Sequence, residues 1–203
     1  MLKTFRESLC AGILITIGGT VFLSCENKTA GAVLFSVALL CICYKGYYLF
    51  TGKIGYIVEQ HKKQDFLNLA VGLFGNLIAT FLLGMLLRTV LPNIGERAAE
   101  MCSAKLAQFP LYSFIRGFFC GILMYLAVSI YKEKNSVWGV LFCVPVFILC
   151  GFEHSIADMF YFGISGIFDT KIIFFMALIV AGNTLGAMVL PLLKGVHTNE
   201  KQG

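Results

Sequence analysis

The chain has 203 residues, of which 58% are hydrophobic and only 13% charged, with a mean hydropathy of +0.83 and a formal net charge of +5. Soluble domains carry about 25% charged residues, so this composition excludes an ordinary soluble protein and indicates an integral membrane protein. The basic residues form no run interleaved with aromatics, and we therefore expect no nucleic-acid partner.

The sequence predicts six membrane spans, because a bilayer takes about 20 apolar residues per crossing helix. In chain order they are expected at residues 5–24, 30–50, 66–91, 109–131, 137–168 and 172–193. The fifth is too long for one crossing and is expected to be interrupted around residues 153–155. The connection between the third and fourth spans is expected to be an outer loop. The predicted fold class is an all-α membrane protein with a single transmembrane domain over residues 1–203.

The charged residues predict an orientation. Lys3, Arg6 and Glu7 lead directly into the first span with no cleavage site after it, so no cleaved signal is expected. If both termini face the cytoplasm, the inner connections carry more lysine and arginine than the outer ones, as positive-inside topology requires. We therefore expect a multi-pass protein of the cell membrane with both termini cytoplasmic.

Most of the eight cysteines fall inside predicted spans, where cysteine acts as a small apolar filler. Cys25 and Cys102 fall in predicted outer loops and could pair, but we expect them not to. No cysteine or histidine cluster has metal-ligand spacing, so neither a metal nor a cofactor is expected.

Residues 151–156 read Gly-Phe-Glu-His-Ser-Ile and lie inside an apolar stretch. A charge at membrane depth costs about 2.5–3.5 kcal/mol on insertion scales, so polar residues there indicate passage of something polar. His154 has the side chain whose proton affinity lies nearest physiological pH, and we expect it to line a pore. Glu153 is its neighbour and should point elsewhere, so Glu153 and Ser155 are expected to hold the loop.

The chain also contains an internal repeat, with halves at about residues 5–91 and 109–193. The Gly-Ile-Leu motif at Gly12 recurs at Gly121, and the Gly-Asn motif ending at Asn76 recurs at Asn183, at nearly the same separation. Three spans per half predict inverted repeats related by an axis in the membrane plane. The repeat places a second break at residues 44–53, so helices two and five are both expected to be broken.

These motifs resemble those of the formate/nitrite transporter family. Residues 151–157, followed by Met159-Phe160, resemble its signature, residues 49–52 (Leu-Phe-Thr-Gly) its first re-entrant loop, and the two Gly-Asn pairs its paired motifs. The resemblance implies an aquaporin-like fold, a homopentamer with one pore per subunit, and passage of small monovalent anions such as formate, nitrite or hydrosulfide. It implies no enzymatic activity.

The same resemblance assigns roles position by position. It places His154 at the centre of the pore, Thr51 opposite it and Asn183 on the pore side, and it gives Lys105 a part in attracting anions. It assigns the apolar constrictions to Phe35, Leu39, Leu49, Phe50 and Phe147.

Three positions depart from the family pattern. The family usually has an acidic residue where Tyr48 stands, an asparagine where Tyr125 stands and a small or apolar residue where Lys45 stands. Losing an acid and gaining a lysine adds positive charge to one loop. We hypothesise that Lys45 makes the electrostatic potential there more favourable for anions.

Several functions are compatible with these residues. His154 could hand a proton to the anion, or stay neutral while partly hydrated anions pass. An intramembrane enzyme using Glu153, His154 and Asp158 is a second candidate, but an enzyme needs no duplicated half. A neutral-solute pore is a third, although the Asn-Pro-Ala boxes of such pores are missing from the sequence.

Overall fold

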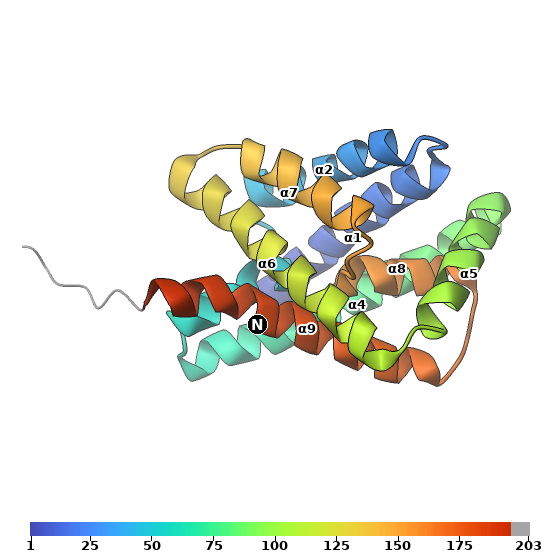
Figure 1. Cartoon of the computed structure of the whole chain (residues 1–203). Helices are drawn as coiled ribbons and strands as arrows, with labels where there is room; N and C mark the ends of the chain where they lie inside the picture. The colour runs from blue at the N-terminus through green and yellow to red at the C-terminus, as the bar shows by residue number, and fades with distance from the viewer. Residues whose placement is uncertain (196–203) are drawn as a thin grey trace, which may run out of the picture.

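The computed structural model describes residues 1–195 and is all helical over that range (Figure 1). Five helices are long and apolar enough to cross a membrane, namely α1 (Leu2–Ser24), α2 (Lys28–Lys45), α4 (Lys63–Val90), α6 (Pro110–Lys134) and α9 (Lys171–Lys194). The shorter elements are α3 (Phe50–Lys53), the 3-10 helix η1 (Ile54–Val58), α5 (Pro92–Leu106), α7 (Trp138–Leu149) and α8 (Ser155–Ser165).

Two of the six predicted spans are split, which confirms the prediction that helices two and five are broken. The second span becomes α2 followed by α3 and η1, and the fifth becomes α7 followed by α8. Both breaks begin at a glycine with a φ of 67°, Gly46 and Gly151. This left-handed conformation is open to glycine without steric cost and is a common way to end a helix.

The backbone turns in the same way at both breaks. The Tyr47 N–H donates to the Ile42 carbonyl at 3.0 Å, and the Phe152 N–H donates to the Phe147 carbonyl at 2.9 Å. Such bonds satisfy carbonyl groups that a helix end would otherwise leave without a partner. The two breaks therefore have the same backbone conformation, one in each half of the repeat.

The two halves are each held together by close helix packing, α1 on α4 and α6 on α9. Gly12 of α1 lies against the Asn76 carbonyl and Ala79 of α4, and Gly121 of α6 lies against the Asn183 carbonyl of α9. Neither position has room for a Cβ atom. Small residues of this kind let helix backbones approach closely, which is how helices associate in a membrane. The Gly-Ile-Leu repeat in the sequence therefore marks equivalent contacts.

Two buried asparagines tie the breaks to this packed frame. Asn76 accepts a hydrogen bond from the Phe50 N–H (2.9 Å) and donates to the carbonyls of Ser8 (2.8 Å) and Tyr48 (2.9 Å). The bonds to Phe50 and Tyr48 satisfy backbone groups at the break, and the bond to Ser8 fixes the Asn76 amide to α1. Because the bilayer core offers no water, groups freed by a helix break need such protein partners.

Asn183 makes the equivalent set of contacts in the second half. It accepts from the Ser155 N–H (2.9 Å) and donates to the carbonyls of Gly117 and Glu153 (both 2.8 Å). The sequence analysis placed Asn183 on the pore side. In the structure the residue is fully buried, and its amide holds the break that contains His154.

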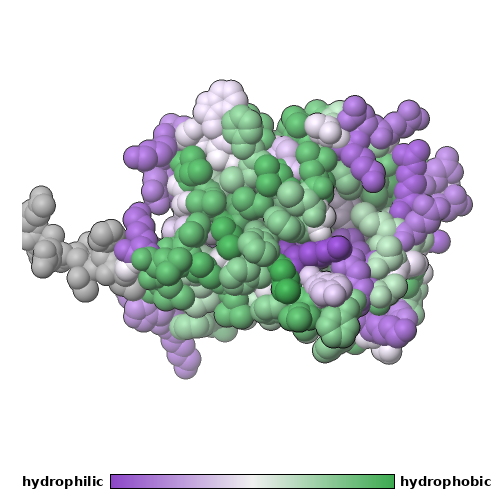
Figure 2. Space-filling model, viewed as in Figure 1, coloured by the Kyte–Doolittle hydropathy of each residue, from purple (hydrophilic) through white to green (hydrophobic). Residues whose placement is uncertain are grey.

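The molecule has two polar ends and an apolar waist. The α5 end, at the right of Figure 1, carries α5 and the connections 25–27, 107–109 and 166–170; the η1 end, at the left, carries η1 and the connections 59–62 and 135–137. Figure 2 shows green side chains across the middle of one face, with purple ones gathered mainly at both ends. Large apolar side chains such as Ile17, Phe74 and Phe142 are more than half exposed. Such a surface fits a hydrocarbon surrounding.

The connection at residues 92–108 is not the loop expected from the sequence, because most of it is helix α5. Pro92 occupies the first turn, where its missing N–H has no cost, and the small residues Gly95, Ala98 and Cys102 form one buried face. Their spacing of three and four residues is the signal that could have revealed this helix. Cys25 and Cys102 are both free, as expected.

We predict that Asn76→Ala and Asn183→Ala destabilise the protein to a similar degree. Each substitution removes three hydrogen bonds to the backbone, and a buried group left unsatisfied costs about 1–3 kcal/mol. Thermal unfolding of the detergent-solubilised protein should show a loss of several degrees for both variants. The control is Asn93→Ala, which changes an exposed asparagine. A shift at Asn76 or Asn183 no larger than the control shift would contradict this account.

Candidate functional site

The two helix breaks meet at a single hydrogen bond near the centre of the molecule. Thr51 lies in α3, just after the first break, and His154 is the N-cap residue of α8, just after the second. Thr51 Oγ1 and His154 Nε2 are 2.8 Å apart, and both side chains are buried. The structure thus brings together the two residues that the sequence analysis placed opposite one another.

The second nitrogen of His154 is occupied as well. Nδ1 accepts a hydrogen bond from the Ala157 N–H at 3.1 Å, which caps the first turn of α8. In a neutral imidazole only one nitrogen carries hydrogen, so Nε2 carries it and donates to Thr51 Oγ1. A second proton on Nδ1 would break the cap. The geometry therefore selects a neutral His154 with a fixed tautomer.

Aromatic side chains surround this hydrogen bond. The Phe147 ring stacks on the His154 ring, with centroids 5.6 Å apart and planes 19° apart. The Phe35 ring meets the Phe147 ring edge-on, with ring centroids 6.4 Å apart. Both phenylalanines, together with Leu39 and Leu49, are almost completely buried. Phe50 is buried too, and its backbone N–H is the group that Asn76 binds.

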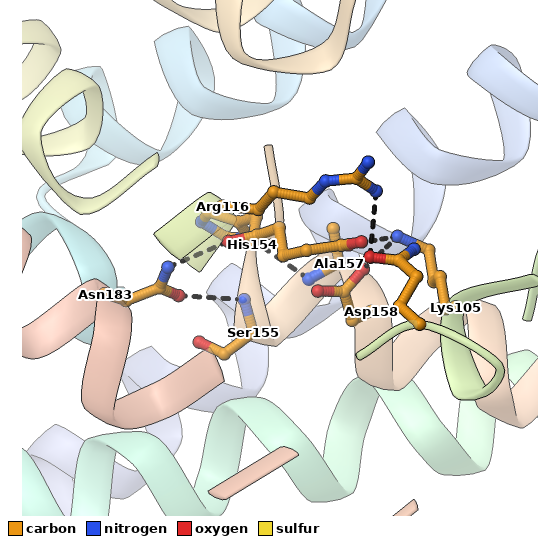
Figure 3. A network of polar contacts seen from close by, with 9 residues as sticks. Lys105, Arg116, His154, Ser155, Ala157, Asp158 and Asn183 are labelled. Atoms are coloured by element: carbon orange, nitrogen blue, oxygen red, sulfur yellow. Dashed lines mark hydrogen bonds and ion pairs between the residues drawn. The ribbon is translucent and has the colours of Figure 1, made fainter. Parts of the chain in front are cut away.

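A cavity of about 240 Å³ opens beside His154 toward the α5 end. We call it the α5-side cavity. Its wall includes Phe147 and His154 from the central site and four charged residues, Lys105, Arg116, Glu153 and Asp158. Figure 3 shows Lys105, Arg116 and Asp158, which come from α5, α6 and α8 and converge on this region.

Lys105 lies between two carboxylates in this cavity. Its Nζ contacts Glu153 Oε2 closely and lies 3.0 Å from Asp158 Oδ1. The Lys105 side chain is 13% exposed, whereas the side chains of Glu153 and Asp158 are each only 2% exposed. Burial would lower the pKa of Lys105, but Asp158 and Glu153 outweigh it and raise that pKa above its ordinary value. Lys105 therefore stays protonated.

The part of Asp158 in this cluster was not among the predictions from the sequence. Those predictions placed Glu153 with the loop scaffold and Lys105 with anion attraction, and the structure joins both in one ion-pair cluster. The only signal for Asp158 was its position four residues after His154, on the same side of a helix. Arg116 had no assigned role, and in the structure it donates to Gln108 Oε1 at 2.9 Å.

A second cavity, of about 60 Å³, lies toward the η1 end, and we call it the η1-side cavity. Leu39 and Leu49 line it at the central side, and Lys53 and Lys132 line it farther out. The Lys132 ammonium lies 3.7 Å from the centre of the Tyr56 ring. Within residues 1–195, neither Lys53 nor Lys132 takes part in an ion pair.

Two of the three departures from the family pattern make aromatic contacts near the lysines of this second cavity, although neither is part of its wall. The Lys53 ammonium is 5.7 Å from the centre of the Tyr48 ring, and the Tyr125 ring packs against Tyr56 at 5.6 Å. Lys45 is exposed in the last turn of α2 and is not part of the wall of either cavity. Its part in attracting anions stays a proposal.

A family model described as formate/nitrite transporter matches residues 1–194. The chain belongs to this family. It is therefore a multi-pass membrane channel or transporter and not an enzyme.

Individual relatives agree with this assignment. The uncharacterized transporter YwcJ of Bacillus subtilis (strain 168) is 31% identical over 185 residues, which is 81% of this chain and 72% of that protein. The formate channel FocA of Escherichia coli (strain K12) is 25% identical over 187 residues, which is 78% of this chain and 65% of that protein. The chain thus spans slightly less than two thirds of FocA.

Solved structures share the fold of this family member. A pentameric formate channel with formate bound superposes with a TM-score of 0.78 at 24% identity, covering 95% of both chains. A structure described as an FNT family ion channel gives a TM-score of 0.76 at 19% identity, covering 95% of this chain and 87% of that one. The aquaporin-like fold expected from the sequence is confirmed.

We predict that His154 is neutral near pH 7, with its hydrogen on Nε2. Nitrogen NMR of protein labelled with ¹⁵N-histidine should show this tautomer, because Nδ1 is held as an acceptor by the Ala157 N–H. His61→Asn and His197→Asn would assign the signals, since the chain has three histidines. A signal showing hydrogen on Nδ1, or on both nitrogens, would contradict the geometry.

Proposed function

We propose that this family member conducts small monovalent anions of weak acids, with formate, nitrite and hydrosulfide as the candidate substrates. The observation that carries the proposal is the Thr51–His154 hydrogen bond between two cavities, flanked by the buried rings of Phe35 and Phe147. A polar contact inside an apolar constriction is suited to a small solute that can both accept and donate hydrogen bonds. A weak acid can both donate and accept hydrogen bonds, and its anion can accept them.

The apolar constriction explains how the pore would exclude ions while letting neutral acids pass. Removing water from a bare ion is far more costly than removing it from a neutral acid of the same size. A ring built from Leu39, Leu49 and Phe147 offers no replacement ligands for an ion. We therefore propose that Phe35, Leu39, Leu49, Phe50 and Phe147 form the selective part of the pore, with His154 and Thr51 as its polar contact.

Cationic groups at both ends support the choice of anions. Lys53 and Lys132 lie at the η1-side cavity, and Lys105 and Arg116 lie at the α5-side cavity. Fixed positive charge in a cleft raises the local concentration of anions and speeds their entry. We propose that Lys45 and Lys105 add to this attraction, with Lys45 acting from the surface.

The quaternary structure is part of the proposal. The solved neighbour with formate bound is a pentamer, and this chain has an apolar outer surface that neighbouring subunits and lipid could share. We propose a homopentamer with one pore per subunit, in the cell membrane, with both termini cytoplasmic. Three spans per half and a lysine-rich η1 end agree with that orientation.

Uptake into proteoliposomes by stopped-flow light scattering tests the substrate class. Formate, nitrite, hydrosulfide and glycerol are compared at two pH values, with protein-free vesicles to measure the leak of each neutral acid. We expect at least one of the three anions to enter several-fold faster than in protein-free vesicles, and glycerol to enter no faster. Glycerol uptake that matches or exceeds anion uptake would replace the proposal with a neutral-solute pore.

A further inference from the structure

The ion-pair cluster of the α5-side cavity has more acidic than basic groups. Lys105 supplies one positive charge, whereas Glu153 and Asp158 would supply two negative charges if both were ionised. All three side chains are largely buried. An uncompensated charge in such a place is unfavourable, because neither water nor a partner stabilises it. The charge count balances when one carboxyl group carries a proton.

The contacts indicate which carboxyl group holds that proton. Asp158 Oδ1 faces the Lys105 ammonium, but Asp158 Oδ2 is buried and has no hydrogen-bond partner within residues 1–195. Glu153 instead contacts the Lys105 ammonium through Oε2, and neither of its oxygens is among the buried atoms without a partner in residues 1–195. Asp158 itself is 1% exposed. A buried polar atom with no partner calls for an explanation, and a functional role is one of those known from other proteins.

No other group near Asp158 replaces this proton. On α5, Lys105 and Cys102 face it, and on α8 itself Tyr161 lies one turn away. On α4, Arg88 is bound to the carbonyls of Ile164 and Ser165, farther along α8. On α6, Arg116 lines the cavity and donates to the neutral Gln108, and Cys120 is fully buried. The packed part of α1 brings the apolar side chain of Phe22.

We propose that Asp158 is a proton-binding residue that donates its proton to the anion in the α5-side cavity. This inference rests on the proposed function. His154 is a poor donor to the anion, because its Nδ1 caps α8 and its Nε2 hydrogen is bound to Thr51. Asp158 lines the same cavity one turn away and has a free oxygen. Its carboxyl group can release a proton without breaking the cap of α8 or the Thr51–His154 hydrogen bond.

The transfer is balanced and needs no other reactant. An anion such as formate enters the cavity and is held by the Arg116 guanidinium. The O–H bond at Asp158 Oδ2 breaks, an O–H bond forms on the anion, and the Asp158 carboxylate keeps the electron pair. The neutral acid crosses the apolar ring and releases its proton on the η1 side. Asp158 then takes a proton from water, which reaches the cluster at the partly exposed Lys105.

Proton and formate fluxes measured together in proteoliposomes test this inference. Formate uptake and internal pH are followed while a potassium gradient with valinomycin sets the membrane potential. For the wild-type protein we expect about one proton per formate and a rate independent of the potential. Asp158→Asn should carry formate without a proton and depend on the potential, or lose uptake near neutral pH. Asp158→Glu should restore the one-to-one ratio.

Two further measurements keep the outcome decisive. In acidified solution much of the formate is already formic acid, so an inactive Asp158→Asn variant should regain uptake there, measured above the leak of protein-free vesicles. Asp169→Asn, an exposed aspartate at the α5 end, should behave like the wild type. A one-to-one ratio in Asp158→Asn, or no recovery in acid, would overturn the role of Asp158. Absence of anion uptake by the wild type would instead overturn the proposed function.

Discussion

The structure depends on two asparagine side chains that replace water inside the membrane. A helix that breaks in the bilayer core leaves backbone groups without partners, and the surrounding lipid cannot supply them. Asn76 and Asn183 each bind one N–H at a helix start and two carbonyls, one of them in the neighbouring packed helix. Both breaks are therefore fixed to rigid helix pairs, and the residues they carry are held in place.

This constraint places a polar contact where the bilayer would otherwise be purely apolar. Because the breaks come from opposite sides, Thr51 and His154 meet between them, and the cap of α8 leaves His154 one tautomer. The contact is enclosed by Phe35 and Phe147. The apolar ring would favour a neutral acid over its anion because it offers no replacement for the water around a charge, so we assign proton donation to a group outside the ring. The cluster around Asp158 supplies such a group.

Much of the fold could be predicted from the sequence because its signals are local or repeated. Apolar length gives the spans, and the pairs Gly12 with Gly121 and Asn76 with Asn183 give the inverted halves. The break at Gly151 is visible because polar residues follow it within an apolar run. Helix α5 was missed because its buried face consists of small residues, which carry little hydropathy signal although their spacing is helical.

The sequence predicted several residues of the site but not which side chains contact one another. The resemblance brought His154 and Thr51 together, and the structure shows how they meet. The partners of Lys105 depend on how α5 folds back over α8, which is a tertiary relation that no local pattern encodes. The tie made by Asn183 is of the same kind, since it joins residues far apart in the chain. Charge balance within a cluster likewise appears only once its members are adjacent.

The most direct test of this account is formate uptake by Thr51→Val compared with Thr51→Ser in proteoliposomes. Valine keeps the shape of threonine but leaves the Nε2 hydrogen of His154 without an acceptor, whereas serine keeps the hydroxyl. Losing one such hydrogen bond corresponds to roughly tenfold in rate. The account predicts that uptake falls about tenfold in Thr51→Val and stays near wild type in Thr51→Ser, with similar unfolding temperatures. Wild-type uptake by Thr51→Val would contradict it.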